Sequence, residues 1–115
     1  MSIPLELTFR DMPPSDAVAT AIRDALDRLA KVSDRLQRCV AVVERPHQSQ
    51  RHGQAFHVRL ELVVPDRVVT VAHDPGDADA HENVYAAIAD AFRAARRQLQ
   101  DHAEIQRGDV KTHAG

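Results

Sequence analysis

One segment, residues 82–99 (ENVYAAIADAFRAARRQL), sets the strongest limit on how this chain can fold. Tyr85, Ile88, Phe92 and Leu99 recur at steps of three, four and seven residues, which places them in one stripe along an α-helix. Six alanines in the same segment favour the helix and allow its backbone to approach a neighbouring layer closely. The pattern predicts a helix that buries its apolar stripe against a sheet.

The rest of the chain predicts one further helix and four strands. Apolar residues alternate with polar ones in the strands and recur every three or four residues in the helix. The strands are expected at residues 3–10, 36–45, 55–64 and 67–73, and the first helix at about 16–31 after Ser15 as its N-cap. A helix between the first two strands allows a parallel pair, and the short connections that follow predict an antiparallel meander. The predicted fold class is α+β, a two-layer β-α-β-β-β-α domain whose four-stranded mixed sheet carries both helices on one face.

Length and composition indicate a single domain. A chain of 115 residues has room for one core, which we assign to residues 1–103. Residues 104–115 lose the apolar period, so we expect a flexible C-terminal tail. No apolar run approaches the ~20 residues of a membrane span, and the N-terminus has no secretory pattern. The single cysteine, Cys39, lies in a valine-rich run, so a core role in a reducing cytoplasm is expected.

Catalytic and metal-binding patterns are weak. The sequence contains no Gly-rich phosphate loop, no nucleophile elbow and no His-Glu-x-x-His helix, so we expect no enzyme and no cofactor. His47, His52 and His57 are spaced by five residues, which is not the close pairing of structural zinc sites. We predict no metal site, with these three histidines as the only candidates.

Charge is distributed unevenly along the chain. Residues 35–59 contain five basic residues and one acidic residue, whereas residues 60–92 contain one basic and seven acidic. This segregation predicts a basic surface and an acidic surface in one fold. Arg93, Arg96 and Arg97 lie within about one helical turn, and guanidinium groups bind phosphate in a bidentate fork. The same cluster would also stabilise the C-terminal part of a helix, so a purely structural role stays open.

Three segments carry a resemblance to a known family. VYAAI (84–88) followed by RQL (97–99) resembles the second-helix signature of the ribosome hibernation promoting factor and ribosome-associated inhibitor family, also called the sigma 54 modulation protein family. SDRL (33–36) closes the first helix where that family has a similar turn, and a valine-rich second strand follows in the family's order. The resemblance spans residues 3–102 and fits the short form of the family.

Membership implies a fold resembling a double-stranded-RNA-binding domain. It also implies a cytoplasmic protein that binds ribosomal RNA of the small ribosomal subunit and silences translation in stress or stationary phase. From the sequence itself we expect no membrane and no small-molecule substrate as partner. The matching basic residues are Arg28, Arg35 and Arg97. With the helix cluster and the tail, the expected RNA-binding set is Arg28, Arg35, Arg93, Arg96, Arg97, Arg107 and Lys111.

A second function remains open from the sequence. Positions that are commonly lysine in the family are Ala25, Ala94, Asp101 and Ala103 here, which removes candidate phosphate contacts. The alternative is a protein-interaction or stress-regulatory domain of the same fold with weak or no RNA affinity, whose contact surface would be the acidic stretch 66–90.

Overall fold

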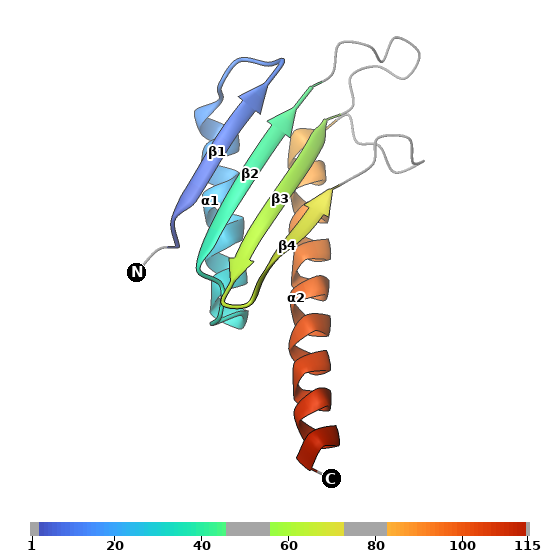
Figure 1. Cartoon of the computed structure of the whole chain (residues 1–115). Helices are drawn as coiled ribbons and strands as arrows, with labels where there is room; N and C mark the ends of the chain where they lie inside the picture. The colour runs from blue at the N-terminus through green and yellow to red at the C-terminus, as the bar shows by residue number, and fades with distance from the viewer. Residues whose placement is uncertain (1–2, 46–55, 73–82, 115) are drawn as a thin grey trace, which may run out of the picture.

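The structure contains four strands and two helices in the predicted order. The computed structural model describes residues 3–45, 56–72 and 83–114, with side chains described as far as residue 101. The elements are β1 (Leu5–Arg10), α1 (Asp16–Val32), β2 (Arg38–Glu44), β3 (His57–Val64), β4 (Arg67–Ala72) and α2 (Val84–Ala114) (Figure 1). Apart from the end of α2, each observed boundary lies within two residues of the predicted one.

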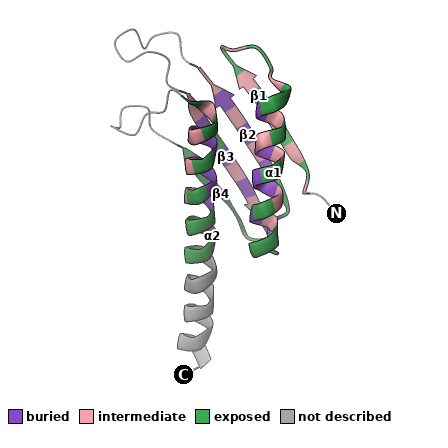
Figure 2. Ribbon diagram, turned by 180° about the vertical axis from the view of Figure 1, so that it is seen from behind, coloured by how far each residue is buried: buried purple, intermediate pink, exposed green. Residues whose placement is uncertain are grey.

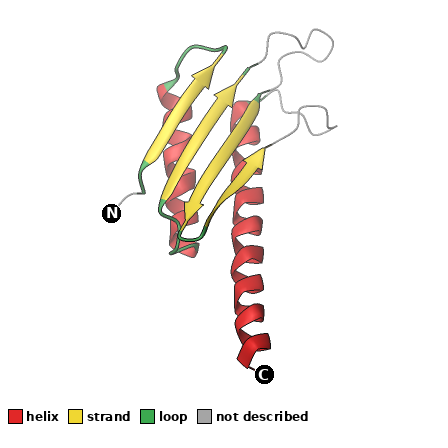
Figure 3. Cartoon of the chain, viewed as in Figure 1, coloured by secondary structure: helices red, strands yellow, loops and turns green. Residues whose placement is uncertain are grey.

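The four strands form one mixed sheet in the order β1-β2-β3-β4. β1 pairs with β2 in parallel, with Leu7 opposite Ala41, and the other two pairs are antiparallel. Both helices cover the same face of this sheet, and the opposite face is left open (Figure 3). The predicted two-layer α+β fold with a four-stranded mixed sheet is therefore confirmed.

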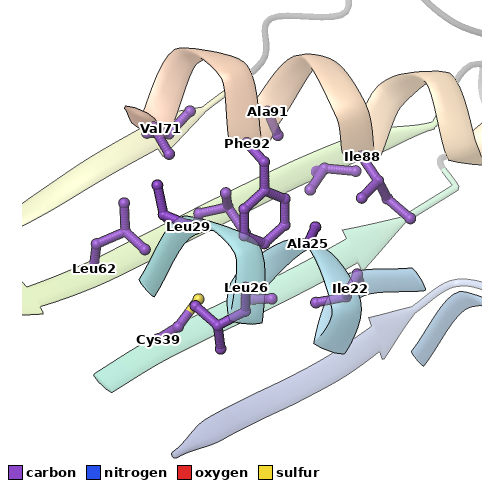
Figure 4. Packing of buried hydrophobic residues seen from close by; sticks show 14 of the residues in the cluster. Ile22, Ala25, Leu26, Leu29, Cys39, Leu62, Val71, Ile88, Ala91 and Phe92 are labelled. Atoms are coloured by element: carbon purple, nitrogen blue, oxygen red, sulfur yellow. The ribbon is translucent and has the colours of Figure 1, made fainter. Parts of the chain in front are cut away.

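The core lies between the sheet and the two helices. Alternate strand residues such as Val58, Leu60 and Leu62 are fully buried, because every second side chain points toward the helices (Figure 2). In Figure 4, Phe92 extends from α2 toward α1, among buried side chains that include Ala25. A single apolar cluster joins all of these elements.

The start of α1 follows its sequence signal. Ser15 has an extended backbone, with φ −134° and ψ 120°, and its Oγ accepts a hydrogen bond from the Val18 N–H at 3.2 Å. This bond satisfies one of the donors that a helix N-terminus leaves unpaired, and Asp16 in the first turn suits the positive end of the helix. The predicted N-cap is confirmed.

The helix α2 extends further than its apolar pattern. Its backbone continues to Ala114, fifteen residues beyond the segment 82–99 whose apolar pattern predicted the helix. Residues 104–114 contain no proline, and a helix that is already formed adds further residues at low cost even without a buried stripe. The flexibility of residues 104–115 stays a prediction.

Cys39 belongs to the core. Its side chain is fully buried on β2, and this desolvation raises the pKa of the thiol to about 11, above the ordinary value of 9.0, while the charge of Arg23 acts in the opposite direction. Because the reactive form of cysteine is the thiolate, a buried thiol with a raised pKa is a poor nucleophile. The expected core role of Cys39 is confirmed.

The raised pKa of the Cys39 thiol predicts that the protein loses stability at alkaline pH. In the unfolded chain the thiol ionises near pH 9.0, but in the folded protein only near about 11, so between these values unfolding releases a proton. We expect the free energy of unfolding to fall there by up to about 1.4 kcal/mol per pH unit. Urea denaturation of the wild type and of Cys39→Ala measures this effect as a difference in pH slope. Identical pH slopes for the two proteins would contradict a raised pKa for the buried thiol.

Candidate nucleic-acid interface

The arginines of α2 lie on the side of the helix away from the sheet. Ala95 and Leu99 are buried, whereas Arg96 and Arg97 between them are exposed. At 100° per residue, side chains beside a buried stripe turn toward solvent within one or two positions. The cluster is therefore placed on the outer surface of the helical layer.

The first helix contributes a basic residue at the same level. Both helices start at the same end of the sheet and run in the same direction (Figure 1). Arg28 and Arg96 each lie twelve residues beyond the first residue of their helix, which is about 18 Å along each axis. Arg28 follows Ala25 by three residues and Arg96 follows Phe92 by four, so each shares the side of its helix that faces the other helix (Figure 4). Arg28 and Arg96 thus flank the line where the two helices meet.

Three of the predicted arginines lack partners among the described residues. Arg28, Arg96 and Arg97 are exposed and form no hydrogen bond or ion pair with another described residue. By contrast, Arg93 donates from Nη1 to Asp90 Oδ1 at 2.5 Å, which offsets its charge. Arg35 is exposed in the turn after α1 and does have an interaction partner. The unpaired guanidinium groups are the ones available to an external anion.

The sequence prediction missed one basic residue of this surface. Lys31 is exposed in the last turn of α1, three residues after Arg28, and pairs with no described residue. The three-residue spacing from Arg28 was the signal that could have identified it. We call Arg28, Lys31, Arg96 and Arg97 the basic helical face. Three exposed carboxylates lie beside it, Asp24 and Asp34 near α1 and Asp101 one turn after Arg97 on α2.

The open face of the sheet has a different electrostatic character. Arg38 bonds to Glu6, and Arg59 lies 3.6 Å from Glu61, so these two arginines are compensated by glutamates of the sheet. Exposed pairs of this kind contribute little to stability, but they do reduce the potential of the surface that carries them. Arg10 is exposed on the same face without a side-chain partner among the described residues, so a phosphate chain would meet one such basic residue there and four on the basic helical face.

The histidine candidates do not assemble a metal site in the described part of the chain. His57 lies on β3 with its Nδ1 3.8 Å from Glu44 Oε1, a pairing that depends on protonation. His47 and His52 fall outside the described residues. Within residues 3–45, 56–72 and 83–101, no three potential ligands gather closely enough to hold a metal ion.

Two further predicted contacts cannot be placed on this surface. Arg107 and Lys111 belong to the α2 backbone, but their side chains fall outside the described part of the chain. Four of the six acidic residues in the stretch 66–90 also lie outside the described residues, since residues 73–82 are not described. Their roles stay predictions. No described helix is both long and apolar enough to cross a membrane.

Fold and surface together define a small two-layer α+β domain with an unpaired basic helical face. The family described as sigma 54 modulation protein / S30EA ribosomal protein matches residues 5–107 of the chain. The chain therefore belongs to this family, which confirms the resemblance carried by its second helix.

Solved structures agree with this assignment at the level of the fold. The N-terminal domain of protein Y from Thermus thermophilus aligns with a TM-score of 0.63 and 20% identity, over 89% of this chain and 99% of that one. A ribosomal subunit interface protein from Coxiella burnetii aligns with a TM-score of 0.72 and 11% identity, again over 89% and 99%. No curated protein matches the sequence. The expected likeness to a double-stranded-RNA-binding domain stays a prediction.

Proposed function

We propose that this protein binds ribosomal RNA of the small ribosomal subunit through its basic helical face, and that by occupying this site it silences translation in stress or stationary phase. The family description names a ribosomal protein, and one structural neighbour is a ribosomal subunit interface protein. The observation that carries the proposal is that Arg28, Arg96 and Arg97 are exposed on one face without partners among the described residues. The proposal involves no catalytic step and no cofactor, and its partner places the protein in the cytoplasm.

The chemistry of this face suits a phosphate backbone. Arginine presents several N–H donors in a planar fork, and an unpaired guanidinium need not first break an ion pair to bind phosphate. Each neutralised phosphate contributes about 0.7 to 0.9 to the slope of log affinity against log salt. Four contacts from the basic helical face give a slope of about −3 to −4, so doubling the salt concentration weakens binding about tenfold.

Sedimentation with separated ribosomal subunits tests the proposal. We expect the protein to pellet with the small subunit at low salt, to be released along the predicted slope as salt rises, and to reduce translation in a reconstituted system. A protein that stays in the supernatant at the lowest salt concentration would refute RNA binding.

One observation favours the alternative of a protein-binding domain with weak RNA affinity. Asp90 pairs with Arg93 and so removes one candidate phosphate contact from the second helix. Under this alternative, binding to the subunit would depend little on salt and would survive loss of the arginines. The same salt series distinguishes the two functions.

A further inference from the structure

Tyr85 departs from the stripe to which its sequence spacing assigns it. The pattern of α2 predicts a core residue, but 49% of Tyr85 is exposed, whereas Ile88 and Phe92 of the same stripe are buried. The other exposed large apolar residues in the described chain are Val68 on the sheet and Val32 at the end of α1. Tyr85 is therefore the one phenylalanine or tyrosine in the described residues that is about half exposed to water.

The ring is placed on the same side of α2 as Arg96. Tyr85 precedes Phe92 by seven residues and Arg96 by eleven, which are close to two and three full turns. Phe92 points toward α1 in Figure 4, so Tyr85 and Arg96 lie along the side of α2 that borders the other helix. They are separated by about 17 Å along the axis, and Ala89 between them adds only a methyl group to the surface.

The local structure fixes the base of this side chain and leaves its tip available. Asn83 Oδ1 accepts a hydrogen bond from the Tyr85 N–H at 2.8 Å, which holds the first turn of α2 in place. The phenol hydroxyl forms no hydrogen bond with another described residue. A half-exposed ring that is held at its backbone and lies on the same side of the helix as an unpaired arginine suits the stacking of a nucleobase.

We propose that Tyr85 stacks on an unpaired nucleobase of the RNA whose phosphates bind the basic helical face. This inference rests on the proposed function and narrows it, because a base inside a duplex is already stacked on its neighbours and is not available to the ring. The site would therefore select a loop or single-stranded segment over a continuous RNA helix. Stacking of one base on an aromatic side chain typically contributes a factor of about 5 to 100 in affinity.

The sequence provides a direct probe of this contact. The chain has one tyrosine and no tryptophan, so its intrinsic tyrosine fluorescence reports Tyr85 alone. We expect a single-stranded oligouridine to quench this fluorescence, with correction for RNA absorption, and inorganic polyphosphate, which has the charge without the bases, to leave it nearly unchanged. A duplex RNA of equal length should also quench it weakly. Equal quenching by all three ligands would overturn the proposal.

Variants of Tyr85 test the same contact in binding to the small ribosomal subunit. Tyr85→Ala should weaken subunit binding about 5- to 100-fold, and Tyr85→Phe, which keeps the ring, should stay within about twofold of the wild type. Val68→Ala, at the exposed valine of the sheet, is the matched control and should leave affinity unchanged. If Tyr85→Ala binds like the wild type, the stacking contact is refuted and RNA binding by the basic helical face stands. If the wild type itself fails to bind the subunit, the proposed function fails, and the stacking contact with it.

Discussion

Replacing Arg96 and Arg97 together by alanine is expected to weaken binding to the small ribosomal subunit by about 100-fold or more. Both side chains are exposed and pair with no described residue, so each can make a charge-assisted bond to phosphate without losing one within the protein. Such bonds contribute about 1.5 to 3 kcal/mol each. The salt slope should also become shallower by about 1.4 to 1.8.

The matched control changes the same charge on the opposite face. Arg38→Ala with Arg59→Ala also removes two positive charges, but from arginines that lie beside Glu6 and Glu61 on the open sheet face. We expect this variant to bind nearly like the wild type and to keep its salt slope. Equal losses in the two double variants would show that binding follows net charge alone, which would refute the basic helical face as the contact surface. Circular dichroism establishes that both variants are folded.

Phe92→Ala is expected to have the largest effect on stability, a loss of about 3 to 5 kcal/mol in the free energy of unfolding. The ring is buried among side chains from both helices (Figure 4), so its removal leaves a cavity where α1, α2 and the sheet meet. Small domains have a total stability of about 5 to 15 kcal/mol, so this variant would be close to unfolding.

Urea denaturation of Phe92→Ala beside Val68→Ala measures this loss. Val68 is 53% exposed on β4, so its truncation leaves no internal cavity. We expect it to lower the free energy of unfolding by less than about 1 kcal/mol. A loss of similar size in both variants would mean that Phe92 does not hold the helices to the sheet. Ribosome binding should fall with the folded fraction of Phe92→Ala, because the basic helical face exists only while both helices are docked.

The basic residues show where sequence reasoning succeeded and where it stopped. The spacing of Arg93, Arg96 and Arg97 placed all three in one turn of α2, and all three are exposed. Their pairing differs, because Arg93 bonds to Asp90, which the sequence allowed but did not require. Lys31 was overlooked as a contact although its three-residue spacing from Arg28 on α1 already places the two side chains on one side of that helix.

The spacing of Tyr85 predicts a buried side chain, and the structure does not bury it. Its spacing from Ile88 and Phe92 is that of a core residue, yet the ring is half exposed because it lies in the first turn of α2. A helical period defines a direction around the helix axis but not how far the neighbouring layer extends along it. The same limit explains why the period gave no account of the helical turns of α2 beyond residue 103.

The sequence by itself determined the order and type of the elements, the N-cap at Ser15 and the apolar side of each helix, because these depend on neighbours a few residues apart in the chain. Only the tertiary structure decided that Arg28 and Arg96 lie at one level on facing sides of two helices. This property depends on the docking of α1 and α2 on one sheet, and residues separated by more than sixty positions meet only when that docking has occurred.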